Sequence, residues 1–119
     1  MLLEDLCQLS GVSGNEDEVR NFICKEIEGN CDYKIDALGN IIAFKKGNKT
    51  PAKKLMIAAH MDEVGLIVTS IKADGTLRIS PVGGIDAGVV IGRQVSVGEE
   101  KLIGVIGAKA VHNLTADEK

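Results

Sequence analysis

Aromatic residues are scarce in this sequence: its 119 residues include one Tyr, two Phe and no Trp. Because 45% of the residues are apolar, we expect a folded core rather than disorder, and that core must rely on aliphatic packing. Long apolar runs are also absent. None approaches the roughly 18 residues of a membrane-spanning helix, so the sequence predicts no transmembrane helix and no membrane partner.

Basic clusters, paired cysteines and a secretory leader are missing as well. Acidic and basic residues are interspersed and the net charge is −3, which argues against nucleic acid as a partner. The three cysteines, Cys7, Cys24 and Cys31, show no C-x-x-C spacing, which indicates reduced thiols in a cytoplasmic protein. The opening stretch MLLEDLCQLSG is acidic where a signal peptide is basic.

The most informative stretch is 54–66, KLMIAAHMDEVGL. Its apolar run Leu55–Ala59 is typical of a short strand buried on both faces, as in a parallel sheet covered by helices. Open α/β sheets bind ligands just beyond the carboxyl ends of such strands, where His60 and Asp62 follow. In a strand these two side chains project from the same face, roughly 7 Å apart at Cα, and Glu63 points to the other face.

The His60–Asp62 spacing has two interpretations. An imidazole can bind a metal through one nitrogen while a carboxylate orients its other N–H, so the pair fits a metal site. The alternative is a polar strand end beside a turn. The spacing by itself leaves both open.

Two helices are predicted before this stretch. Leucines at helical spacing predict a short helix over Met1–Leu9. A capping box, with Ser13 as N-cap and Glu16 three residues later, predicts a second helix that ends near Gly29. Its apolar stripe is expected to cover one face of the sheet and consists of Val19, Phe22, Ile23 and Ile27.

Short strands separated by turn residues are predicted elsewhere. They are expected at 32–36, 40–46, 65–71, 77–80, 94–98 and 102–106. The close spacing of the last four, with glycine turns between them, favours a small β-barrel or sandwich, and the composition shifts near Val64–Val68. The glycine-rich segment Gly83–Gly88 lacks the Lys-Ser/Thr of a phosphate loop and no helix pattern follows it, so we interpret it as a turn.

Five segments resemble successive blocks of the M42 family of metallo-aminopeptidases, which includes tetrahedral and glutamyl aminopeptidases and relatives labelled endoglucanases. They are SGVSGNEDEVR at 10–20, DALGNIIAFKKG at 36–47, IAAHMDEVGLIV at 57–68, GTLRISPVGGID at 75–86 and GVIGAKAVHNL at 104–114. The resemblance implies an α/β fold. Residues 1–66 would be the N-terminal part of a helix-flanked, zinc-peptidase-like mixed sheet, and residues 67–119 part of a β-rich, barrel-like inserted domain that mediates assembly.

The resemblance also implies a site. The histidine of AAHMDEVG is a ligand of a two-metal centre in that family, so His60 is the expected metal ligand and Asp62 the catalytic-site carboxylate that supports it. Two divalent ions, zinc or cobalt, a peptide substrate and a homo-oligomer built through the β-rich domain are expected with it. His112 is interpreted as a surface histidine or, alternatively, as a residue that reaches a neighbouring subunit's active site.

Family members are considerably longer, and their remaining ligands and catalytic glutamate lie beyond the segments matched here. A capping-box pattern at Thr115–Glu118 predicts a further helix just before the last residue. We therefore expect an N-terminal fragment of an aminopeptidase that is inactive alone. The alternatives are a non-catalytic assembly module and a glycoside hydrolase; the latter is disfavoured because Asp62 and Glu63, adjacent in a strand, point apart.

Overall fold

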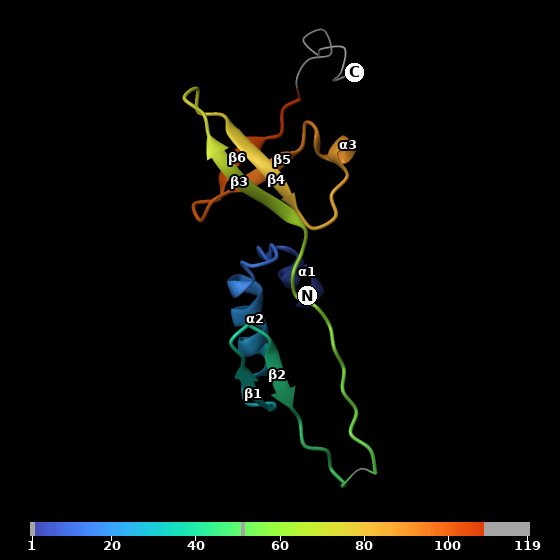
Figure 1. Ribbon diagram of the computed structural model, residues 1–119. Coiled ribbons are helices and arrows are strands. Elements are labelled where there is room, and N and C mark those ends of the chain that lie inside the picture. Colours follow the sequence, from blue (N-terminus) through green and yellow to red (C-terminus); the bar gives the residue numbers. More distant parts are fainter. Residues whose placement is uncertain (1, 51, 109–119) are drawn as a thin grey trace. The chain divides into compact units, whose positions relative to one another are not determined.

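The structure is a computed structural model that describes residues 2–50 and 52–108 (Figure 1). The chain divides into two compact units, 1–83 and 84–119. The first unit contains α1 (Leu2–Cys7), α2 (Asp17–Ile27), β1 (Asp32–Ile35), β2 (Ile41–Phe44), β3 (Gly65–Ile71) and β4 (Leu77–Val82), and the second contains α3 (Ala87–Val90), β5 (Gln94–Val97) and β6 (Leu102–Val105). The domain boundary between residues 66 and 67 stays a prediction.

The described strands pair as three antiparallel hairpins, β1–β2, β3–β4 and β5–β6. The strands predicted outside the run Leu55–Ala59 are thereby confirmed, and the turns between them follow from local chemistry. In the β1–β2 turn, the Asp36 carboxylate accepts hydrogen bonds from the backbone N–H groups of Leu38 at 2.9 Å and Asn40 at 3.0 Å. Gly39 supplies the positive φ of 86° that the turn requires.

A one-turn helix, α3, follows the glycine-rich segment, so the prediction that no helix comes after it is wrong. Asp86 caps this helix by accepting a hydrogen bond from the Gly88 N–H at 2.8 Å. A helix of four residues is too short to leave a periodic apolar pattern, and only its cap marks it in the sequence.

Helix α2 begins at Asp17, with Glu16 as the N-cap residue and no side-chain cap, so the capping box with Ser13 at the N-cap is wrong. The Ser13 hydroxyl instead donates a hydrogen bond to the Asp62 carboxylate, which is 49 residues away in the sequence. The predicted apolar stripe of α2 is confirmed. Val19 is 7% exposed, and the other three members are half-buried.

The apolar run Leu55–Ala59 is not a buried strand. Residues 54–62 form no strand, and Leu55, Met56 and Ile57 are each 87% exposed. A strand interior has to pair its backbone N–H and C=O groups with neighbours, and none of the strands in the described part of the chain pairs with this run. Figure 1 shows it as an extended connection between β2 and β3.

The fold of the described residues is therefore mixed α/β with small antiparallel sheets. The helix-flanked mixed sheet and the barrel-like inserted domain stay predictions for the whole protein. Across residues 2–50 and 52–108, no helix is both long and apolar enough to cross a membrane.

Candidate metal site at His60

Two segments far apart in the sequence meet beside His60. Val12 and Glu63 form a parallel β-bridge, in which the Glu63 N–H donates to the Gly11 carbonyl at 2.7 Å and the Ser13 N–H donates to the Glu63 carbonyl at 3.2 Å. The Glu63 carboxylate adds a hydrogen bond from the Gly11 N–H at 3.1 Å. We call this contact between Gly11–Ser13 and Glu63 the clasp.

Glycines on both sides of the clasp allow this close approach. A Cβ on Gly11 would lie 2.8 Å from a methyl of Val19 and 3.2 Å from the Met61 carbonyl oxygen. A Cβ on Gly65 would lie 2.5 and 2.6 Å from the two methyls of Val12. Larger residues at either position would push the segments apart, which explains the glycines physically.

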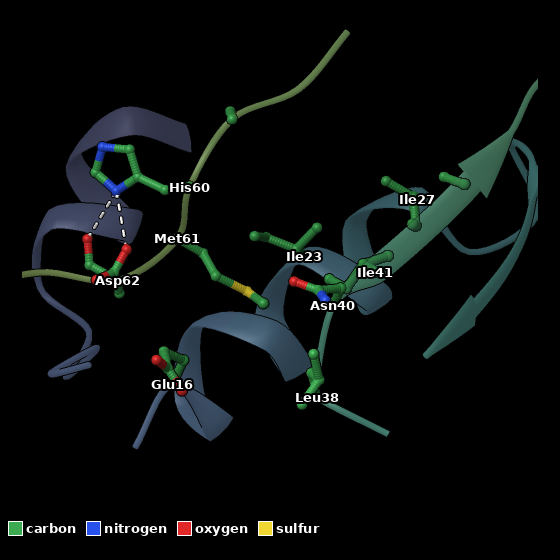
Figure 2. A pocket seen from close by; sticks show the side chains of 12 residues that line it. Glu16, Ile23, Ile27, Leu38, Asn40, Ile41, His60, Met61 and Asp62 are labelled. Carbon is green, nitrogen blue, oxygen red and sulfur yellow. Dashed lines mark hydrogen bonds and ion pairs between the residues drawn. The ribbon is translucent and has the colours of Figure 1, made fainter. Parts of the chain in front are cut away.

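The imidazole of His60 faces two hydrogen-bond acceptors. Its Nδ1 lies 3.0 Å from the Asp62 carbonyl oxygen and 3.1 Å from the Asp62 carboxylate Oδ1 (Figure 2). Because neither partner can donate, Nδ1 must carry the proton, and in the neutral imidazole Nε2 then presents its lone pair. The side chain of His60 is 86% exposed, so this lone pair is accessible to a metal ion.

Asp62 bridges His60 and Ser13. Its Oδ2 accepts the Ser13 hydroxyl hydrogen bond at 2.5 Å, while Oδ1 faces the imidazole. The Ser13 hydrogen bond, followed by smaller contributions that include the nearby His60, holds the pKa of Asp62 below its usual value despite some desolvation. The carboxylate is therefore ionised at neutral pH and accepts both hydrogen bonds as an anion.

His60 and Asp62 lie on the same side of the chain, as the spacing predicts. Figure 2 shows Met61 turned the other way, toward Ile23 of α2. Alternation of this kind is a property of extended backbone and does not need a sheet. Glu63, bound to Gly11, stays out of the His–Asp pair as expected.

A cavity of about 420 Å³ adjoins the pair. Its apolar wall comes from α2, the β1–β2 turn and β2, and its polar end from His60 and Asp62. The residues that line it are Glu16, Ile23, Ile27, Leu38, Gly39, Asn40, Ile41, Ala43, Ala59, His60, Met61 and Asp62.

His60 and Asp62 fit a part of a metal centre, one ligand and its hydrogen-bond partner. His60 offers a single oriented nitrogen ligand, and among residues 2–50 and 52–108 no group of three or more His, Cys, Asp or Glu side chains is placed to hold an ion. His112 lies outside the described residues, as does the predicted helix start at Thr115–Glu118. The described part of the chain thus offers one potential ligand, His60, and a carboxylate that orients it.

Ser13 was missed as a site residue by sequence reasoning. Serine shortly before a helix is a common N-cap, and that local interpretation concealed its contact with Asp62. The glycine that follows Ser13 is the sequence signal that distinguishes a helix N-cap from a contact with a distant residue. Gly14 has a φ of +90° and donates its N–H to the Glu16 carboxylate at 2.6 Å, so the chain turns before α2 begins.

Comparisons with known proteins agree on one family. The family model of the M42 glutamyl aminopeptidases matches residues 39–119, more than half of the chain. A putative aminopeptidase of Acetivibrio thermocellus is 47% identical over 90% of this chain and 31% of its own length. The chain spans about a third of the length of the curated relatives that it matches.

Solved structures give the same result. A Thermotoga maritima protein described as an endoglucanase has 45% identity and a TM-score of 0.81, covering 90% of this chain and 34% of that one. The TET1 peptidase of Pyrococcus horikoshii, which can assemble into a tetrahedron or a large octahedral shell, has 41% identity and a TM-score of 0.78 over 98% of this chain and 36% of its own.

Proposed function

The chain belongs to the M42 family of glutamyl aminopeptidases, and we propose that it forms the N-terminal part of a two-metal aminopeptidase that removes N-terminal residues from peptides. Membership of this family implies the use of divalent metal. The observation that carries the proposal for this chain is the state of His60. Its Nδ1 is held by Asp62, so its Nε2 is presented to a ligand.

In this proposal His60 holds one of two metal ions, zinc or cobalt, through Nε2. Asp62 is the catalytic-site carboxylate that keeps the imidazole in the right tautomer and orientation. When bound, a metal pair of this kind polarises the scissile carbonyl and lowers the pKa of a water. In this proposal His60 and Asp62 hold and orient the metal, and the general base comes from outside the described residues.

The remaining ligands and the base belong to parts of the protein outside the described residues. The described part offers no group of three potential ligands, and the chain spans about a third of its relatives. We therefore propose that the 119-residue chain alone is inactive. The exposed run Leu55–Ala59 fits the same proposal, because it would become a buried strand once the rest of a helix-flanked sheet covered it.

A non-catalytic assembly module is the second candidate. It is favoured by the exposed apolar side chains of β6, Leu102 at 61%, Ile103 at 76% and Val105 at 65%. Such surface suits contact with another subunit. The TET1 peptidase of Pyrococcus horikoshii assembles into shells, and we propose a homo-oligomer of this protein through its β-rich part, residues 67–119, as a partial barrel.

Glycoside hydrolysis is the weakest candidate, although one similar structure is described as an endoglucanase. It needs two carboxylates that face each other across a sugar. Glu63 uses its carboxylate to hold the Gly11 N–H, while Asp62 holds Ser13 and His60. The two acids therefore serve separate contacts and do not supply the pair.

Hydrolysis of leucine-p-nitroanilide in the presence of Zn²⁺ or Co²⁺ tests the proposal, together with a Co²⁺ titration of the His60 ring signals by NMR. We expect Co²⁺ to broaden the His60 signals of the wild-type chain and no turnover from the chain by itself. Turnover that His60→Ala abolishes would contradict the proposed inactivity of the chain. Failure of Co²⁺ to reach His60 at millimolar concentration would contradict its role as a ligand.

A further inference from the structure

We infer that Ser13 is a positioning residue of the metal site: its hydroxyl locks the Asp62 carboxylate in the orientation that keeps the proton on His60 Nδ1. The inference rests on the proposed function for its purpose, because a fixed Nδ1–H leaves Nε2 as the metal-binding atom. Ser13 itself binds neither metal nor substrate in this account. It acts through Asp62.

The geometry of the carboxylate carries the inference. Asp62 Oδ2 receives the Ser13 hydroxyl at 2.5 Å and Oδ1 lies 3.1 Å from His60 Nδ1. The terminal torsion of an aspartate is soft, so a carboxylate held at one oxygen can rotate. Held at both oxygens, it cannot rotate without breaking a hydrogen bond. The side chain of Asp62 is 43% exposed, so water competes for Oδ1 once the Ser13 contact is lost.

Ser13 is itself held in place by the clasp. Its N–H donates to the Glu63 carbonyl at 3.2 Å, directly after the bridge between Val12 and Glu63. The two backbone hydrogen bonds of the clasp form without the hydroxyl, which donates at 2.5 Å to Asp62 Oδ2 and lies 3.5 Å from the Glu63 carbonyl oxygen. At 3.5 Å the contact with the Glu63 carbonyl is weak beside the backbone hydrogen bonds that join the two segments, whereas the short hydrogen bond to Asp62 sets the direction of a side chain.

The consequence for His60 is a choice of tautomer. A neutral imidazole carries its proton on either nitrogen, and the acceptors around the ring decide which. The carboxylate Oδ1 of Asp62 and its carbonyl oxygen both favour Nδ1–H. Removing the Ser13 hydroxyl frees the Asp62 carboxylate, the stronger of the two acceptors, to turn away from the ring. In part of the population the imidazole proton then moves to Nε2, where it blocks metal binding.

The test uses Ser13→Ala, with Ser13→Thr as rescue because threonine keeps the hydroxyl. Ser10→Ala is the matched control: it removes a serine hydroxyl from the same segment, and the hydrogen bond of Ser10 to Glu18 goes through its backbone N–H at 3.1 Å, which alanine retains. Ring ¹⁵N shifts report the tautomer directly. With His60 and His112 as the two histidines in the sequence, His112→Gln assigns the spectrum.

We expect the wild-type chain, Ser13→Thr and Ser10→Ala to show the Nδ1–H tautomer of His60, and Ser13→Ala to show a shift toward Nε2–H. The affinity of His60 for Co²⁺ should fall by about tenfold in Ser13→Ala only, in the range seen for partners of metal-bound histidines. A tautomer and an affinity that do not change in Ser13→Ala would overturn the inference.

Two further outcomes separate the possible failures. If Co²⁺ does not bind His60 in the wild-type chain, the proposed function fails, while a tautomer shift in Ser13→Ala still supports the positioning role. If Ser13→Ala also loses the amide-exchange protection of Glu63, the serine acts by holding the clasp together, and the positioning role is refuted.

Discussion

Replacing Gly65 with Ala measures how closely the two segments of the clasp pack. The new Cβ would lie 2.5 and 2.6 Å from the two methyls of Val12 and 3.1 Å from its Cβ. Ordinary carbon contacts lie at about 3.5–4.0 Å, so the overlap is about 1 Å at two atoms. Valine is stiff at χ1, and because both methyls are in the way, rotating the side chain does not remove the clash. The backbone has to move.

Overpacking of this kind costs about 1–3 kcal/mol. Against this cost, replacing glycine with alanine stabilises the folded chain by about 0.4–1 kcal/mol, because alanine lowers the conformational entropy of the unfolded chain. We therefore expect Gly65→Ala to lower the free energy of opening of the clasp by about 1–2 kcal/mol. A change of about 1.4 kcal/mol is tenfold in an equilibrium constant.

Amide hydrogen exchange is the appropriate assay, because it reports the opening of individual backbone hydrogen bonds. The reporter is the Glu63 N–H, bonded to the Gly11 carbonyl at 2.7 Å, and its protection should fall about tenfold in Gly65→Ala. Gly84→Ala is the matched control, because a Cβ there meets nothing within 4 Å.

Val12→Ala provides the second arm of a double-mutant cycle. It removes both clashing methyls and leaves only the 3.1 Å contact with the Cβ of residue 12, so Gly65→Ala should cost much less protection in the Val12→Ala background than in the wild-type chain. Unchanged protection in Gly65→Ala, or a double variant that shows the sum of both losses, would refute the close packing of Val12 against Gly65.

Three other predictions concern the hairpins and α2. Asp36→Ala should fray the β1–β2 turn by removing the acceptor for the Asn40 amide, seen as faster exchange of that amide. Hydrogen bonds from Asn40 also lower the pKa of Asp36. In the wild-type chain the stabilisation of the turn by the Asp36 carboxylate should therefore be complete above the ordinary pKa of about 3.9 and be lost as the pH falls through the lowered folded-state pKa. Protection that stays constant down to about pH 2 would contradict this. Val19→Ala removes two buried methyl groups and should destabilise α2 by about 2 kcal/mol, measured by exchange of its amides, whereas a loss below about 0.5 kcal/mol would mean that the site is not packed. Gly98→Ala places a side chain on a left-handed residue with a φ of 69° and should weaken the β5–β6 hairpin by about 1 kcal/mol; unchanged protection of its amides would contradict this.

The hairpins could be predicted from the sequence because their turns are stabilised by neighbours in the chain. Asp36 bonds to Asn40, and Asp74 bonds to Thr76 two residues later. The same is true of the His60–Asp62 pair, since alternation in an extended segment already places both side chains on one side. These particular features are fixed within five residues and are visible in the sequence pattern.

Features that depend on distant partners were predicted wrongly. The hydroxyl of Ser13 suits a helix cap, but the Asp62 carboxylate, an anion, is the stronger acceptor, and folding brings it within reach. The run Leu55–Ala59 has the composition of a buried strand, but burial depends on what covers a segment, and nothing in the described chain does. Apolar composition reports a tendency to be buried and says nothing of whether a partner is present.

The hydrogen bond between Ser13 and Asp62 closes a loop of 49 residues. The entropy of loop closure grows slowly with length, by about 0.6 kcal/mol for each doubling, so insertions at the exposed tip around Asn48–Thr50 should hardly disturb His60. A contact of such long range also forms slowly compared with a hairpin. If Ser13 positions Asp62 as proposed, we expect the imidazole to acquire its orientation late in folding, after β1 and β2 have paired.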